Sequence, residues 1–166
     1  MTDQLRQSEP TNKSMLNADS GKLMINRLPL ISYFCTKAPI PAIEMSTIVE
    51  PNPNQNFSSP SDKIMFSPLV IEFKLDEDLS NYIELYRWLV GMSVYPIGDI
   101  PVLLDSERFS DATLFTFTNF KKKNRIVKFV DLYPLALSQV DFDTQQTSVE
   151  YITMSASFGY RHFTIE

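Results

Sequence analysis

The sequence is short of the residues on which most enzymes and metal sites depend. Its 166 residues include one cysteine, one histidine and four glycines. The single cysteine, Cys35, excludes an internal disulfide and a zinc site built from cysteines. With no second histidine beside His162, a metal site or a nucleophile–base pair lacks partners, so His162 is expected at an ordinary surface or interface. No GxxxxGK[ST], GxGxxG, HExxH or GxSxG motif occurs. We therefore expect no enzymatic activity, no cofactor and no metal.

One acidic pair resembles the carboxylates of acid–base catalysis. Asp141 and Asp143 are two residues apart and would share one face of a strand. The polar run TQQT follows them at residues 144–147. A polar hairpin turn explains the pair better than a catalytic site does.

Long apolar runs and positive charge are also scarce. No apolar run approaches the roughly 20 residues that span a bilayer, and the polar N-terminus lacks the apolar centre of a signal peptide. The formal net charge of −5 argues against a protein held on nucleic acid by phosphate contacts. We expect one domain over residues 22–166, made in the cytosol and without a membrane partner. Residues 1–21 are either a flexible tail or an arm that orders on a neighbouring subunit.

What the sequence does contain is a strong β pattern over residues 125–166. Residues 126–132 predict a strand that continues through Tyr133 and Pro134 toward a last, alternating strand. The apolar positions of that last strand are Ile152, Met154, Ala156, Phe158 and Tyr160. The positions between them are Thr153, Ser155, Ser157, Gly159 and Arg161. Period-two alternation is typical of a strand with one face on a core and the other on water or a polar neighbour.

The rest of the chain predicts further strands and one long loop. Strands are expected at 22–27 and 30–37, paired about Leu28 and Pro29, and again at 43–49, 63–75, 111–120 and 125–132. Residues 93–110 are irregular. Residues 50–62 hold three prolines, three asparagines and three serines and no aliphatic side chain. They are either a binding element that orders in an assembly or a mobile surface loop.

One helix is predicted at residues 79–90. Apolar residues recur there at helical spacing: Leu79, Tyr82, Ile83, Tyr86, Leu89 and Val90. The acidic residues 76–78 are expected to cap its first turn, and Gly91 to follow its last turn. A second apolar stripe, Leu85, Trp88 and Met92, is expected to meet another chain.

Three consecutive lysines mark the tip of the hairpin between residues 111 and 132. Lys121, Lys122 and Lys123 are either solvated charge that guards the end of the hairpin or a contact with an acidic partner surface.

Taken in order, three segments resemble the tail-tube protein family of contractile-tailed bacteriophages. Residues 33–43, YFCTKAPIPAI, are similar to a strand that ends in a proline turn. Residues 61–92 are similar to a strand, acidic turn and helix. Residues 126–160 are similar to a finish with an aromatic–proline pair, a DFD strand and an alternating last strand. The fold is shared by baseplate tube initiators and by the inner-tube proteins of type VI secretion.

The resemblance implies a mainly β, α+β fold: an antiparallel β-sandwich or barrel with one central α-helix packed on it. It also implies hexameric, stacked rings that build, initiate or cap the inner tube of a virion tail, through which DNA passes. Assembly would take place in the host cytoplasm, with sheath, baseplate or tail-terminator proteins as partners. The candidate subunit-interface residues are Leu85, Trp88, Met92, Lys121, Lys122, Lys123, Thr153, Ser155, Ser157 and Arg161.

Two other functions remain open at this stage. One is a monomeric β-sandwich binding module that recognises a host or protein ligand through residues 50–62. The other is an enzyme whose site is assembled between subunits.

Overall fold

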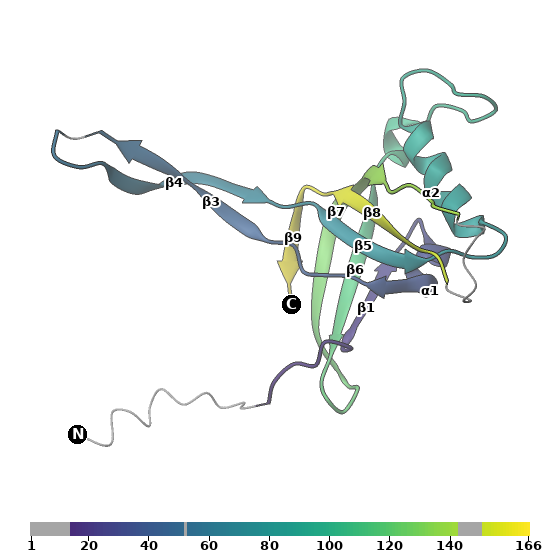
Figure 1. Ribbon diagram of the computed structural model, residues 1–166, viewed down its shortest axis with the longest axis horizontal. Coiled ribbons are helices and arrows are strands. Elements are labelled where there is room, and N and C mark those ends of the chain that lie inside the picture. Colours follow the sequence, from purple (N-terminus) through teal and green to yellow (C-terminus); the bar gives the residue numbers. More distant parts are fainter. Residues whose placement is uncertain (1–13, 52, 143–150) are drawn as a thin grey trace.

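The computed structural model describes residues 14–51, 53–142 and 151–166, and these form an antiparallel β fold with a helix packed on it (Figure 1). The predicted fold class is confirmed. Seven strands form one nearly closed sheet in the order β1-β6-β7-β8-β5-β2, with β9 also paired to β7. Two further strands, β3 and β4, pair only with each other. Within the described ranges, no helix has the length and apolar character needed to cross a membrane.

The large sheet has two halves that share one long strand. Sheet A consists of β1 (Gly21–Ile25), β6 (Ser110–Phe117), the first half of β7 (Lys123–Leu137) and β9 (His162–Ile165). Sheet B consists of the second half of β7, β8 (Thr153–Gly159), β5 (Leu69–Lys74) and β2 (Cys35–Lys37). Strand β7 therefore passes from one sheet into the other.

A local distortion marks the crossing point in β7. Asp131 has a positive φ of 54°, a left-handed conformation in which aspartate is tolerated better than most residues. Its backbone N–H donates to the Asp111 side chain at 3.3 Å, and the register of β6 against β7 shifts between Ser110 and Ala112. The Asp131 carboxylate also pairs with Arg161 at 3.1 Å. Bulges of this kind bend a strand and increase its twist.

The core lies between the two sheets and α2 (Ser80–Gly91). Its largest fully buried side chains include Trp88, Phe73, Phe129 and Phe158. The Trp88 indole N–H donates to the carbonyl of Arg108 at 3.2 Å, so the polar end of this buried ring is satisfied. The alternation predicted for β8 is confirmed, because Met154, Ala156 and Phe158 all face this core.

The predicted helix is confirmed, but its inward face is not the one the sequence favours. The residues that α2 buries are Asn81, Leu85, Trp88 and Gly91. Leu79, Ile83 and Tyr86 are instead 37%, 40% and 38% exposed. Asn81 is buried because its amide donates to the Lys74 carbonyl at 2.8 Å and its oxygen accepts from the Asp76 N–H at 3.3 Å. These two bonds fix the start of α2 against the end of β5.

The predicted ends of the helix are also corrected. Among the described residues, no side chain makes a capping hydrogen bond to α2, and Leu79, with φ of 56°, precedes it. Gly91 lies inside the helix and not beyond it. A Cβ there would lie 2.9 Å from Leu103 Cγ, and the Gly91 carbonyl accepts from the Leu103 N–H at 2.8 Å. This glycine therefore allows the segment around Leu103 to lie directly against α2.

The strand predicted over residues 30–37 is wrong for most of its length. Residues Pro29–Phe34 form the short helix α1, and only Cys35–Lys37 are extended. Proline suits the first turn of a helix, where its missing N–H costs nothing. The expected pairing of 22–27 with 30–37 is wrong too, because β1 pairs with β6 and β2 pairs with β5.

The loop predicted over residues 50–62 is partly strand, because residues 57–62 belong to β4. Strand β4 (Phe57–Phe66) pairs with β3 (Ile43–Glu50), from Ile43 opposite Phe66 to Glu50 opposite Phe57. The two form a ribbon that projects from the body of the molecule (Figure 1). Pro60 lies beside the register shift of this ribbon, a position where proline costs little. The expected single strand over 63–75 is interrupted between β4 and β5.

Candidate functional site: assembly surfaces

Sheet A ends in two strands whose outer edges pair with no described strand. On the β1 side, the Phe117 N–H donates to the Ser20 carbonyl and the Asn26 N–H to the Asp111 carbonyl. Since hydrogen-bonded positions alternate along an antiparallel pair, the backbone groups of Gly21, Leu23 and Ile25 point away from β6. The Ile25 N–H is satisfied by the Ser32 hydroxyl at 2.8 Å. The open part of this edge is therefore Gly21 to Leu23.

A groove of about 1090 Å³ lies along this edge of β1. Its other wall comes from α1, β2 and the residues that follow β2. The lining includes Leu23, Met24, Pro29, Tyr33, Cys35 and Pro39. Tyr33 is 81% exposed, and burial raises the pKa of the Cys35 thiol, which disfavours a reactive thiolate. The groove is thus an apolar channel beside unpaired backbone and not a nucleophilic site.

The opposite edge of sheet A belongs to β9. Ile126 and Glu166 exchange two backbone hydrogen bonds, of 3.0 and 2.9 Å. The next pair, Val127 opposite Ile165, is therefore a non-hydrogen-bonded pair, and the N–H and C=O of Ile165 point outward. Ile165 is also 60% exposed. Sheet A thus presents an open edge at each side.

The ribbon carries a third surface. Ile43, Met45, Ile64 and Phe66 share one of its faces by register, and the first three are more than half exposed. The Phe66 ring contacts the rings of Tyr160 and Phe163, with centroids 6.0 and 5.6 Å away. This apolar face is therefore continuous with the aromatic cluster that joins the ribbon to the body. Isolated exposed apolar residues are common, but a contiguous set of this kind is typical of a contact surface.

The polar residues predicted from β8 lie on the solvent face of sheet B. Thr153 is exposed, whereas Ser155 and Ser157 are half-buried. By register they lie beside Lys74, Glu72 and Val70 of β5, where Glu72 pairs with Lys37 at 2.8 Å. Arg161 follows β8 and is tied to Asp131. These residues therefore lie outside the two open edges of sheet A.

The three lysines of the β6–β7 tip have different surroundings. The Lys121 ammonium pairs with Asp19 at 2.6 Å and lowers the pKa of that carboxyl. The Lys123 ammonium lies 4.7 Å from the centroid of the Phe115 ring. The Lys122 side chain is exposed and makes no hydrogen bond or ion pair with the described residues. Beside it, Phe120 is 87% exposed.

The helix stripe predicted as an interface is placed differently. Leu85 and Trp88 are 1% and 2% exposed within the subunit's own core, and Met92 packs partly against that core. The expectation that Leu85 and Trp88 are available to another chain is therefore wrong. Sequence reasoning missed the ribbon and the two open edges. The alternating apolar residues at 43, 45, 64 and 66 were the available signal for the ribbon.

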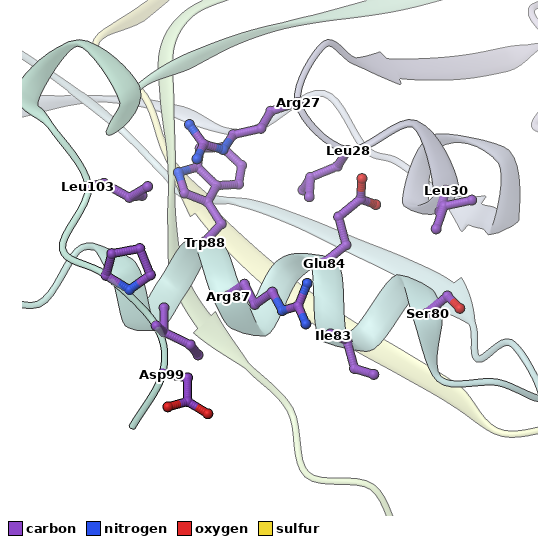
Figure 2. A pocket seen from close by; sticks show the side chains of 12 residues that line it. Arg27, Leu28, Leu30, Ser80, Ile83, Glu84, Arg87, Trp88, Asp99 and Leu103 are labelled. Atoms are coloured by element: carbon purple, nitrogen blue, oxygen red, sulfur yellow. The ribbon is translucent and has the colours of Figure 1, made fainter. Parts of the chain in front are cut away.

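A pocket of about 720 Å³ lies between α1, α2 and residues 99–103 (Figure 2). In it, the Glu84 carboxylate accepts a hydrogen bond from the Leu30 N–H, and burial raises its pKa. Glu84 Oε2 is buried without a hydrogen-bond partner among the described residues. The Arg27 guanidinium lies 5.2 Å from the Trp88 ring and donates to the Glu107 carbonyl.

The described residues offer no group of three or more histidine, cysteine, aspartate or glutamate side chains placed to hold a metal ion. Asp143, one of the two predicted carboxylates, lies outside the described residues, as do residues 1–13 of the predicted arm.

The architecture is that of tail-tube proteins. It superimposes with a TM-score of 0.66 on a chain from the sheath/tube terminator of an extracellular contractile injection system, covering 93% of this chain and 98% of the other at 11% identity. A chain from the baseplate of the anti-feeding prophage, determined with six-fold symmetry, gives a TM-score of 0.64 at 8% identity, with 95% and 97% covered.

In sequence, the chain is similar to the tail tube terminator protein of Enterobacteria phage T4. The two are 27% identical over 134 residues, or 77% of this chain and 74% of the phage protein. No protein-family model matches. The resemblance to tail-tube proteins is thus confirmed. Because these relatives are structural tail components, the expectation that the chain is not an enzyme is confirmed as well.

Proposed function

We propose that this protein forms a hexameric ring of a contractile phage tail, as part of the inner tube through which DNA passes. The observation that carries the proposal is the pair of open edges on sheet A. A four-stranded sheet with an open β1 edge at one side and an open β9 edge at the other can continue into the next copy. Repeated around a ring, such pairing closes a barrel and leaves no strand edge exposed.

The groove beside β1 supports this pairing. It offers space along the unpaired backbone of Gly21 and Leu23, into which β9 of a neighbouring copy would fit. The contact is heterologous, because β1 of one subunit meets β9 of the next, and a heterologous contact closes into a ring when its rotation allows. Six subunits agree with the six-fold symmetrised baseplate structure to which the structurally similar chain belongs.

The ribbon is proposed to cover a neighbouring subunit or another tail protein such as sheath, baseplate or tube. Its apolar face would then be buried on assembly. The similarity to two tube terminators favours a place at the end of the tube. The polar residues of β8 lie on sheet B and Arg161 follows β8, and we propose that these residues face away from the lumen toward other tail components.

The experiment is to substitute proline on the β9 edge and to count subunits by native mass spectrometry and electron microscopy. Ile165→Pro removes the outward N–H without breaking a bond to β7, and edge strands tolerate proline. We expect this variant to stay monomeric while the matched Ile165→Ala variant, which keeps the N–H, still forms rings. A wild-type protein that remains monomeric at high concentration would contradict the proposal and would favour a monomeric binding module.

A further inference from the structure

The lining of the pocket between α1 and α2 suits the binding of one cationic and one apolar group. Its wall is largely apolar, with Leu28, Leu30, Ile83, Trp88, Ile100 and Leu103. Within it, Glu84 Oε2 is buried and receives no hydrogen bond from the described residues. A buried carboxylate oxygen without a donor is costly, so this position favours the arrival of an N–H donor.

The other charges of the pocket do not meet that requirement. Arg27 is held on the face of Trp88 and by the Glu107 carbonyl. Arg87, one turn after Glu84, makes no ion pair with it in the described structure. Asp99 adds a second carboxylate to the lining. The two arginines and two carboxylates balance in charge, and Glu84 Oε2 is the buried carboxylate oxygen of this pocket that has no hydrogen-bond donor among the described residues.

The β6–β7 tip carries the complementary groups. Phe120 is the most exposed large apolar side chain of the described residues, at 87%. Lys122, two residues later, has an ammonium without a partner among the described residues, whereas Lys121 and Lys123 are held by Asp19 and by the Phe115 ring. The tip is itself fixed, because the Thr118 N–H donates to the Lys122 carbonyl and the Lys121 N–H to the Thr118 carbonyl, both at 2.8 Å.

Pocket and tip lie at opposite ends of sheet A. Gly21 pairs with Thr116 next to the tip, whereas Ile25 pairs with Ala112 at the far end, close to the Arg27 and Leu28 of the pocket. Figure 1 shows α2 at one end of the β6–β7 pair and the tip at the other. At about 3.3 Å per residue, the length of β6 separates them by roughly 25 Å, so one subunit cannot join its own pocket and tip.

We propose that the β6–β7 tip of one copy enters the α1–α2 pocket of a second copy, with Phe120 on the apolar wall and Lys122 donating to Glu84 Oε2. A heterologous contact between opposite ends of a subunit repeats along one direction. Combined with the proposed ring, on which this inference rests, it lets rings of this chain stack on one another. At the end of a tube, this contact would place one ring of this chain on another.

The test reverses the two charges and reads out stacking separately from ring formation. Lys122→Glu is expected to leave the hexameric ring intact while lowering the fraction of stacked rings about tenfold or more in electron micrographs, because the pair is desolvated. Glu84→Lys alone should have the same effect, and the double variant Lys122→Glu with Glu84→Lys should restore stacking. Phe120→Ala changes the tip and leaves the pocket unaltered. It should also reduce stacking, and it serves as the second variant if Glu84→Lys fails to fold.

Lys123→Glu is the matched control, since it changes the same charge at the same tip. Stacking that persists in this control supports the specific pairing. Equal loss in Lys122→Glu and Lys123→Glu, or no rescue by a folded double variant, overturns it. Single wild-type rings that never stack overturn the inference and leave the proposed ring intact, whereas the absence of rings removes the proposed function itself.

Discussion

Glu84 is one of four titratable residues in the described part of the chain whose pKa clearly departs from the ordinary value. Burial raises its pKa above the ordinary 4.5, and the hydrogen bond from Leu30 offsets this in part. A carboxyl whose pKa is higher in the folded protein binds its proton more tightly there. Its contribution to stability is therefore present below about the ordinary pKa and is lost as the pH rises through the folded value. At neutral pH the charged form is a cost.

Replacing this carboxyl by an amide should remove that cost. Glu84→Gln keeps an oxygen for the Leu30 N–H, so we expect a higher melting temperature than wild type at pH 7 and little difference at pH 4. Thermal unfolding of the dilute monomer at the two pH values measures it. Glu77→Gln, at an exposed position before the same helix, is the control and should change little at either pH. A lower melting temperature for Glu84→Gln at pH 7 would contradict this account.

At the scale of elements, substitutions in the ribbon can test assembly without affecting the stability of the subunit. It projects from the body and adds no side chain to the buried core. Ile64 and Met65 are adjacent, 54% and 57% exposed, and point to opposite faces of β4. Ile64→Ser is expected to weaken ring assembly severalfold, because its face bears the contiguous apolar surface. Met65→Ser is expected to assemble like wild type.

Both variants should melt within about 1 °C of wild type, since neither side chain is packed in the core and exposed substitutions cost little. Concentration-dependent native mass spectra give the assembly, and calorimetry gives the stability. If the two variants assemble equally well, the apolar face is not the contact surface.

The elements also show how far the sequence determines the fold. Period-two alternation located β8 correctly, because its inward residues Met154 and Phe158 enter a core formed by strands on both sides. Helical spacing located α2 but offered two apolar stripes. Which stripe faces the core depends on Asn81, a polar residue that is buried because its side chain hydrogen-bonds to the backbone of Lys74 and Asp76. The pattern of apolar residues does not indicate the burial of an asparagine.

The two elements that were mispredicted have similar causes. In α1, Ile31 and Tyr33 fit an alternating strand, but the Ser32 hydroxyl hydrogen-bonds to the backbone of both Ile25 and Leu28 and holds a helical turn. The first part of β4, residues 57–62, has the composition of a loop, and its pairing with β3 holds it extended. The open edges of sheet A are properties of topology, so the sequence could not single out Leu23 or Ile165.

At the scale of the whole molecule, the proposed ring makes a prediction about backbone protection. The N–H groups of Leu23 and Ile165 point to the open edges of sheet A and should become hydrogen-bonded when β1 meets β9 of the next copy. Their hydrogen exchange is expected to slow about tenfold or more in assembled rings relative to the monomer, because an amide that is hydrogen-bonded in a stable sheet is protected from exchange.

The amides of Thr164 and Met24 serve as controls, because register places them in hydrogen-bonded pairs within the subunit. NMR or mass-spectrometric exchange on monomer and ring measures both sets. Slowing confined to the ribbon, with Leu23 and Ile165 unchanged, would show that copies meet through the ribbon and not through the sheet.

The passage of β7 through both sheets has a mechanical consequence. The first half of this strand is part of the proposed channel wall and the second half is part of sheet B, with Asp131 at the bend. A force applied to either sheet is therefore transmitted to the other through the covalent backbone of β7. Side-chain packing between the sheets only resists the sliding of one sheet over the other. The bend is the point where that load changes direction, and its two tethers, Asp111 and Arg161, connect it to β6 and to the turn before β9. Under force, we expect the ribbon to detach long before the two sheets part.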